Sequence, residues 1–140
     1  MAERRASNDF KCDNARLWAT NTRSFQFEAD CWSKSVGRLD VHYSSGVGNH
    51  WFYLASEGSG AKTINGVSYN SPTCNGSTVT GIGNQKASAI WYRALTVYMT
   101  STTDYKGART ATLNAAKDLY GATSPEYATV AAAWSAVKVS

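Results

Sequence analysis

The chain has 140 residues, of which 43% are hydrophobic and 17% are charged, a composition typical of one globular domain with its own core. The formal net charge of +4 comes from basic residues that form neither a continuous run nor a recognition motif, so we expect no nucleic-acid partner. We also expect no membrane partner, because no apolar run is long enough to span a bilayer.

Residues 1–29 are predicted to form a basic N-terminal arm, because they show no sustained helical or strand periodicity. The arm is either solvated and disordered, or it adds a strand or a short helix. It opens with Met-Ala-Glu-Arg-Arg, but the apolar core that a secretory signal requires does not follow. The chain therefore either stays in the cytoplasm or has lost its true N-terminus.

A helix and a hairpin are predicted in the next part of the chain. After Asp40 the chain enters a helix whose apolar face includes Val47, Trp51 and Leu54. Residues 59–80 are rich in Gly, Ser, Thr and Asn. Within them, residues 62–69 predict a β-hairpin, because Asn-Gly between two short strands favours a type I′ turn.

Residues 84–140 predict three successive helices. The first starts near Asn84 and has an apolar stripe at spacings of three and four, formed by Ala87, Ile90, Trp91, Ala94, Leu95 and Tyr98. The second runs from about Lys106 to Tyr120 after a stretch of capping side chains. Its small-residue stripe allows close packing and comprises Ala108, Ala111, Ala115 and Leu119, with Leu113, Ala116 and Tyr120 beside it.

The end of the second helix and the start of the third carry clear signals. Gly121 is a candidate left-handed residue after the second helix. Ser124-Pro125-Glu126 combines a capping hydroxyl, a proline suited to the first turn and a carboxylate at the positive end of the helix dipole. The third helix should bury Tyr127, Val130, Ala131 and Trp134. We therefore predict a mainly α-helical bundle with a small β-hairpin insertion.

One stretch carries the chemistry: Asp-Val-His-Tyr-Ser-Ser-Gly-Val-Gly-Asn over residues 40–49. A carboxylate two residues before an imidazole can orient the ring and favour its charged form. Such a ring can donate a hydrogen bond to a developing oxyanion. The alternative from these residues alone is a helix-starting Asp40 and a polar His42 near a surface.

This stretch resembles the segment of thermolysin-like (M4) zinc metallopeptidases that carries their transition-state-stabilising histidine. Four later stretches also resemble that family, in the same order: residues 81–86, 90–96, 115–121 and 130–134. The resemblance covers roughly residues 30–140 as one domain, and the start at residues 30–32 and the insertion at 61–80 resemble the Streptomyces-like branch. It implies the helical fold of the C-terminal domain of these enzymes.

The resemblance also implies roles for individual residues. His42 would stabilise the tetrahedral oxyanion of peptide hydrolysis, and Asp40 would hold His42 in the productive tautomer. Tyr43 would line the substrate cleft, and Arg16 lies near the place of a family Arg that binds the substrate carbonyl. We interpret Asn49 as structural. His50 falls where the family varies, so we expect it at the surface.

The chain departs from the family in its metal chemistry. The family zinc is held by His-Glu-x-x-His and a downstream Glu, but this chain has two histidines and neither begins that motif. We therefore expect no metal bound by this chain and no peptidase activity from it alone. Zinc, and calcium with it, is expected only in a complete family enzyme.

The resemblance finally implies a partner and a compartment. The chain would be a C-terminal domain or fragment of a secreted endopeptidase, whose partners are a peptide substrate, the missing N-terminal half, or a second copy through exposed cleft surface. Cys31 and Cys74 would pair in an oxidising compartment, leaving Cys12 as the odd thiol; the alternative is that both are buried free thiols. The alternative function is a non-catalytic carbohydrate- or protein-binding module, which predicts exposed Trp or Tyr on the 61–80 side, whereas a peptidase half predicts them beside His42.

Overall fold

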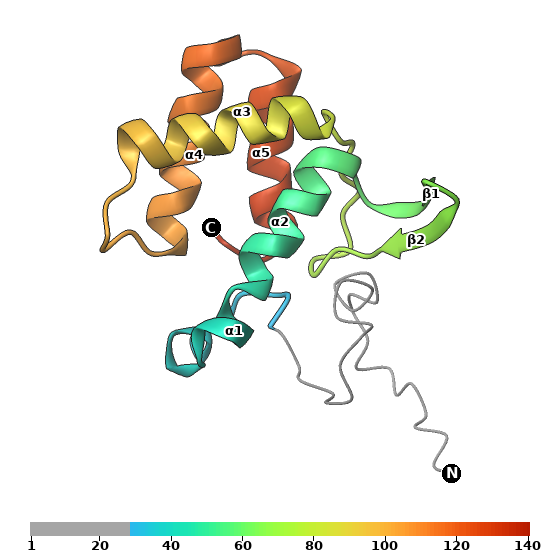
Figure 1. The fold of residues 1–140 in the computed structure, drawn as a ribbon, viewed down its shortest axis with the longest axis horizontal. Helices are drawn as coiled ribbons and strands as arrows, with labels where there is room; N and C mark the ends of the chain where they lie inside the picture. The colour runs from blue at the N-terminus through green and yellow to red at the C-terminus, as the bar shows by residue number, and fades with distance from the viewer. Residues whose placement is uncertain (1–28) are drawn as a thin grey trace.

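The computed structural model describes residues 29–140 and shows a mainly helical domain with one hairpin (Figure 1). The predicted arm, with Arg16 and Cys12, lies outside the described residues apart from Ala29. In chain order the elements are a 3₁₀ turn η2 (Val36–Arg38), α1 (Val41–Ser44), α2 (Gly46–Glu57), β1 (Gly60–Ile64), β2 (Val67–Ser71), α3 (Asn84–Arg93), the π-helix η3 (Ala94–Tyr98), α4 (Tyr105–Tyr120) and α5 (Pro125–Ala136). The predicted fold class is confirmed.

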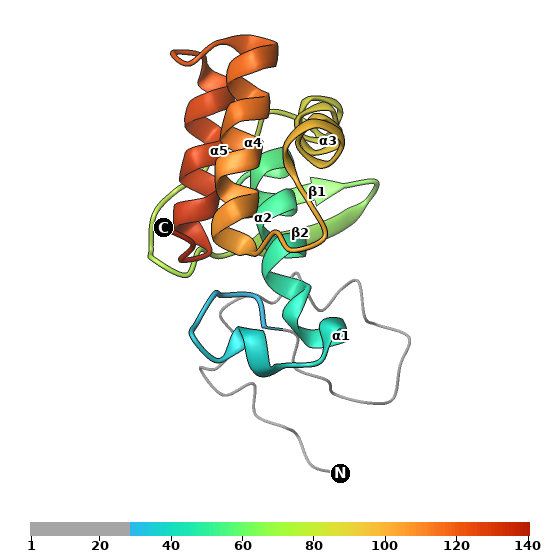
Figure 2. The same ribbon diagram turned by 90° about the vertical axis from the view of Figure 1, so that its left-hand side faces the viewer.

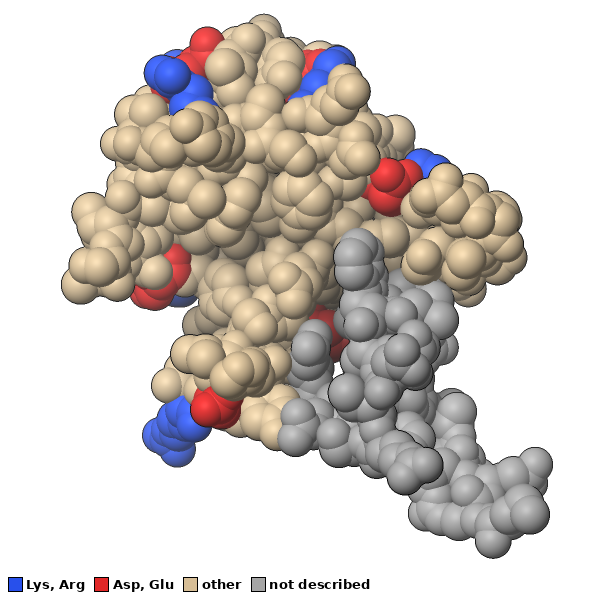
Figure 3. All heavy atoms as spheres, in the orientation of Figure 1, with Lys and Arg blue, Asp and Glu red and all other residues tan. Residues whose placement is uncertain are grey.

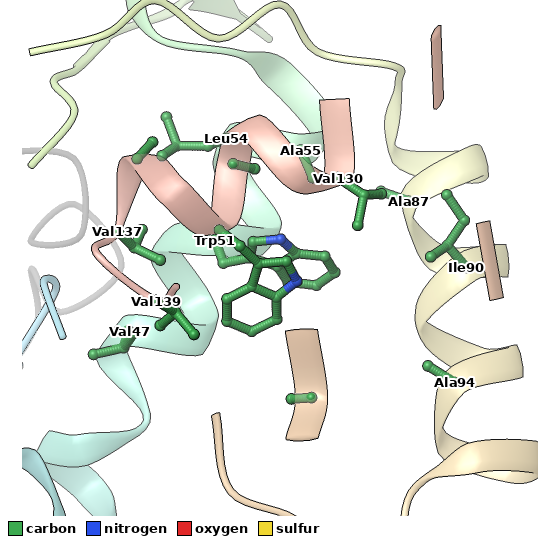
Figure 4. Close-up of a cluster of buried hydrophobic side chains, with 14 of the residues drawn as sticks. Val47, Trp51, Leu54, Ala55, Ala87, Ile90, Ala94, Val130, Val137 and Val139 are labelled. Atoms are coloured by element: carbon green, nitrogen blue, oxygen red, sulfur yellow. The ribbon is translucent and has the colours of Figure 1, made fainter. Parts of the chain in front are cut away.

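The core forms around two stacked indole rings. Trp51 of α2 and Trp134 of α5 lie with ring centroids 4.5 Å apart and planes 15° apart, and both side chains are fully buried. Small and branched side chains from α2, α3 and α5 surround them (Figure 4). The predicted apolar face of α2 is confirmed, because Val47 and Leu54 are also fully buried.

The third helical segment departs from its predicted stripe. Ala87, Ile90 and Ala94 are buried as expected, but Leu95 is 46% exposed and Tyr98 is 37% exposed. The chain changes from α-helix to π-helix at Ala94. A π-helix has more residues per turn than an α-helix, so side chains after this point rotate away from the core. The prediction that Leu95 and Tyr98 continue the stripe is therefore wrong.

Helices α4 and α5 lie side by side (Figures 1 and 2). Their starts are capped as expected: Asp104 accepts from Gly107 N at 2.8 Å, and Ser124 accepts from Tyr127 N at 3.1 Å. Gly121 ends α4 with a positive φ of 95° but an extended ψ of 153°. The predicted burial of Leu119 is wrong, since this side chain is 43% exposed.

The hairpin is confirmed with its turn. Strands β1 and β2 pair antiparallel, and Ile64 opposite Val67 is the last pair before the turn. Asn65 and Gly66 have φ values of 50° and 78°, which a type I′ turn requires at both central positions. The hairpin projects from the helices at the end of α2 (Figure 1).

The C-terminal end of α5 is tied to two distant segments. Its late carbonyls accept hydrogen bonds from Asn75 Nδ2 (to Ser135 O, 3.1 Å), Cys74 N (to Ala136 O, 2.7 Å) and Trp32 N (to Val137 O, 2.8 Å). Cys31 and Cys74 form a disulfide with Cα atoms 6.0 Å apart, the pairing that the resemblance implies. This junction joins the start of the described domain to its end.

Candidate functional site

Asp40 and His42 lie together at the start of the short helix α1. Asp40 is the N-cap residue, and its Oδ1 accepts from the His42 backbone amide at 2.9 Å. Asp favours this position because its side chain satisfies an amide that has no partner inside the helix. The same Oδ1 lies 2.5 Å from His42 Nδ1. One carboxylate oxygen therefore fixes both the helix start and the imidazole ring.

The pair lies at the surface, since the His42 side chain is 83% exposed and that of Asp40 is 59% exposed. Helix α1 lies at the end of α2 that is remote from α3 (Figure 2). Because Nδ1 donates to the carboxylate, Nε2 is the ring nitrogen left for another group. It accepts a hydrogen bond in the neutral ring and donates one in the imidazolium. The arrangement can therefore present a donor to an anionic oxygen.

The electrostatics favour a charged carboxylate at Asp40. The backbone amide of His42, and next its ring, donate to Asp40 and lower the pKa of the carboxyl below 3.8. A hydrogen bond to the charged form always acts in this direction. Asp40 is thus an anion at neutral pH and holds the Nδ1 proton of His42.

The other residues to which the resemblance assigns a role lie close by or outside the described part. Tyr43 follows His42 in α1 and is partly buried, and its carbonyl accepts from Ala29 N at 2.9 Å. Asn49 is exposed in the first turns of α2. The substrate-binding role of Tyr43 stays a prediction, as does that of Arg16, which lies outside the described residues.

His50 is not a surface residue, and that prediction was wrong. The residue is buried, with 3% of its surface exposed. Its Nδ1 lies 2.9 Å from the carbonyl of Asp30, and its Nε2 lies 3.1 Å from that of Pro72. A usable signal was present in the sequence. His50 follows Val47 by three residues and precedes Leu54 by four, which places it on the apolar face of α2.

The described residues do not fit a zinc site. Residues 29–140 contain no group of three or more His, Cys, Asp or Glu side chains that could hold a metal. Asp40 and His42 bond to each other, and the His50 ring faces backbone carbonyls. A zinc site needs three or four such ligands converging on one point.

The described helices include none long and apolar enough to cross a membrane.

The exposed aromatic side chains match neither the peptidase half, which predicts them beside His42, nor the alternative of a binding module, which predicts them on the 61–80 side. On the hairpin, Tyr69 is partly buried and its ring lies 6.1 Å from that of Tyr53. The most exposed large aromatic of the described part is Tyr92 on α3, at 70%. Beside His42 the exposed apolar groups are aliphatic, Leu39 at 40% and Val41 at 70%. The hairpin therefore presents no exposed Trp or Tyr for a ligand.

The fold is that of a helical domain of a metallopeptidase. The family model described as "Thermolysin metallopeptidase, alpha-helical domain" matches residues 13–139, and the chain belongs to this family. The match begins inside the stretch that the sequence assigned to a separate arm, so the boundary at residue 29 stays a prediction.

Several curated proteins are similar over most of this chain. A transglutaminase-activating metalloprotease of Streptomyces mobaraensis is 59% identical over 110 residues, which is 79% of this chain and 14% of that protein. A bacillolysin of Bacillus cereus is 44% identical and a thermolysin of Bacillus caldolyticus 43% identical, each over 99 residues and 71% of this chain. The chain spans 14% to 16% of the length of these relatives.

Proposed function

We propose that this domain supplies the histidine side of a zinc endopeptidase active site. His42, as an imidazolium, would donate from Nε2 to the peptide carbonyl oxygen as that oxygen becomes negative. Asp40 would keep the Nδ1 proton in place and so fix the orientation of the ring. The observation that carries the proposal is the 2.5 Å contact between Asp40 Oδ1 and His42 Nδ1 on an exposed helix, in a domain of the thermolysin family.

The metal would come from elsewhere in a complete enzyme. The ligand set of residues 29–140 does not fit zinc, and the relatives are several times longer than this chain. We infer that the zinc, the attacking water and any calcium belong to a part beyond this domain. The peptide substrate would then lie between that part and α1.

The surface of the domain supports contact with such a part. In Figure 3 the central face over α2 and α3 carries almost no charged side chains, which gather instead at the edges. The exposed Tyr92, Leu95 and Val97 lie on α3 and η3. Uncharged surface with exposed apolar groups is suited to a complementary half or to a second copy. The disulfide supports secretion, because such bonds persist in oxidising compartments.

The first experiment uses the full chain alone. We expect no turnover of a furylacryloyl peptide or of casein when the purified protein is incubated with zinc, because the described residues do not assemble a metal site. Turnover that a chelator abolishes would contradict the proposal that the metal comes from another part.

The second experiment tests His42 in a complete enzyme. Residues 30–139 would replace the matching segment of the Streptomyces mobaraensis metalloprotease, and peptide hydrolysis would be measured. We expect H42A to lower kcat by about 10²–10³-fold with little change in KM, since an oxyanion donor acts in the transition state. K62A, on the exposed hairpin, is the matched control. A kcat for H42A within twofold of the kcat of the unmutated hybrid enzyme would contradict the proposal.

A further inference from the structure

The hydroxyl of Tyr105 lies between helices α1 and α2. Tyr105 is the first residue of α4 and follows Gly48 of α2 by 57 residues. Its Oη donates to Ser44 O at 2.6 Å and accepts from Gly48 N at 3.2 Å. One phenol therefore bonds the last carbonyl of α1 and an early amide of α2.

This contact interrupts what would be one continuous helix. In an unbroken α-helix the amide of Gly48 would donate to the carbonyl of Ser44, four residues earlier. Bonds of this kind lie before and after the break: Ser45 N to Val41 O at 3.1 Å and Asn49 N to Ser45 O at 3.0 Å. Within the break, Tyr43 O accepts from Ala29 N and the hydroxyl of Tyr105 takes the bonds of Ser44 O and Gly48 N. A side chain inserted into the ladder in this way bends a helix, so the hydroxyl contributes to the separation of α1 from α2.

Helix α1 has few other contacts among residues 29–140. It contains four residues, and none of them is buried. Within this described part, two contacts tie its backbone to other segments: Ala29 N to Tyr43 O at 2.9 Å and Tyr105 Oη to Ser44 O. A helix without a packed face takes its position from such contacts and from its covalent neighbours. The place of His42 therefore depends on them.

We propose that Tyr105 is a positioning residue for His42, setting the angle between α1 and α2 and so the place of the imidazole at the edge of the domain. This inference rests on the proposed function of His42. Tyr105 contacts neither His42 nor Asp40 by any bond in the structure and acts through the backbone of Ser44 and Gly48.

The surroundings of Tyr105 suit a fixed donor. Its ring lies 6.2 Å from that of Trp134, so the core orients it. Burial raises the pKa of the phenol above 10.0, which keeps the proton that Ser44 accepts. A Cβ atom on Gly48 would lie 3.4 Å from both the hydroxyl oxygen and the ring. An alanine methyl at this position would therefore meet the phenol in van der Waals contact, and only a larger side chain would collide with it.

The test compares Y105F with Y98F in the full chain. Both variants lose a phenolic hydroxyl. That of Tyr105 makes two hydrogen bonds, to Ser44 O and from Gly48 N, whereas that of Tyr98 donates to Asp118 Oδ2, at 2.5 Å, between η3 and α4. The chain has two histidines, so NMR resolves the His42 ring signal once H42N assigns it. In Y105F we expect the His42 ring and Gly48 amide signals to shift and the amides of Ser44 and Ser45 to exchange about 10-fold faster, because α1 loses an anchor.

In Y98F these signals and rates should match those of the wild type. Unchanged exchange rates in α5 would show that Y105F keeps its fold. A second variant, G48V, adds carbons beyond a Cβ that already touches the phenol; it tests the same contact while keeping the phenol, and it decides if Y105F does not fold. We expect it to displace the hydroxyl and give the same changes. If both variants leave the His42 signal and the exchange of α1 as in Y98F, the proposal fails.

Kinetics of the hybrid enzyme separate this inference from the proposed function. We expect Y105F to lower kcat by roughly 10- to 100-fold with KM within about twofold, because a misplaced catalytic group affects the transition state most. If H42A leaves kcat unchanged while Y105F still moves the His42 signal, the proposed function is wrong and only the structural link stands. If H42A lowers kcat and Y105F does not, the positioning role is wrong.

Discussion

Asp40 performs two tasks with one oxygen atom, capping α1 and holding the His42 ring. Both tasks need the charged carboxylate. A protonated acid loses much of its strength as an acceptor. The titration of the Asp40 carboxyl therefore reports directly on its two hydrogen bonds to His42.

We predict that Asp40 titrates below 3.8, because hydrogen bonds from the His42 amide and ring lower its pKa in the folded protein. A lowered folded-state pKa means that the stabilisation is fully present above the unfolded value and is lost as pH falls through the folded value. The carboxyl ¹³C signal should report the midpoint. The free energy of unfolding should be higher for the wild type than for D40N at pH 6, and the two values should become equal in strong acid. A midpoint at or above 3.8 would contradict the prediction.

Thr112 satisfies the buried indole of Trp134. Its Oγ1 accepts from Trp134 Nε1 at 2.7 Å and donates to Ala108 O at 2.8 Å. We predict that T112V, which keeps the shape, lowers the free energy of unfolding by about 1–3 kcal/mol, because a buried N–H loses its partner. Urea unfolding measures the change. Thr110 makes the same kind of bond to Lys106 O at an exposed position of α4, and T110V should stay within about 0.5 kcal/mol of wild type.

Residues differ in how far the sequence reveals them. Asp40 and His42 are two positions apart, so their contact follows from a short motif. His50 has hydrogen-bond partners at residues 30, 71 and 72, which no local pattern predicts, although its spacing from Val47 and Leu54 indicates the apolar face of α2. The role of Tyr105 has no local signal, because its partners lie 57 and 61 positions away. Contacts between remote segments require the fold itself.

Among the elements, the start of α5 depends on Ser124. Its hydroxyl accepts from Tyr127 N and donates to Gly121 O at 2.7 Å, which joins the loop to the helix. We predict that S124A lowers the free energy of unfolding by about 1 kcal/mol, the usual effect of losing an N-cap. Thermal or urea unfolding tests it, with S101A in an exposed loop as the control. Equal stabilities for the two variants would show that the cap contributes nothing.

Elements with local signals were predicted well, and those shaped by packing were not. Caps and the Asn-Gly turn specify their own backbone geometry, so the helix starts and the hairpin appear where the sequence placed them. The π-helix at Ala94–Tyr98 has no such signal, and a regular 3.6-residue period therefore assigned Leu95 and Tyr98 to the wrong face. The break between α1 and α2 was also missed, since it depends on Tyr105.

At the scale of the whole molecule, the Cys31–Cys74 disulfide closes a loop with a sequence separation of 43 that contains α1, α2 and the hairpin. We predict that reduction lowers the free energy of unfolding by about 2–4 kcal/mol, since the cross-link restricts the unfolded chain. Urea unfolding with and without reductant measures this, in a C12S background that prevents thiol exchange. The C31S/C74S variant should match the reduced protein, and insensitivity to reductant would contradict the prediction.

The main-chain bond from Trp32 to Val137 makes neighbours of the two extremities of the described domain. Proteins whose extremities meet tolerate circular permutation and insertion into other chains. We expect a circular permutant that begins at the hairpin turn, with residue 139 joined to residue 30 by a short Gly-Ser linker, to fold into the same helical bundle. The order of these helices along the chain should then have little effect on their final arrangement.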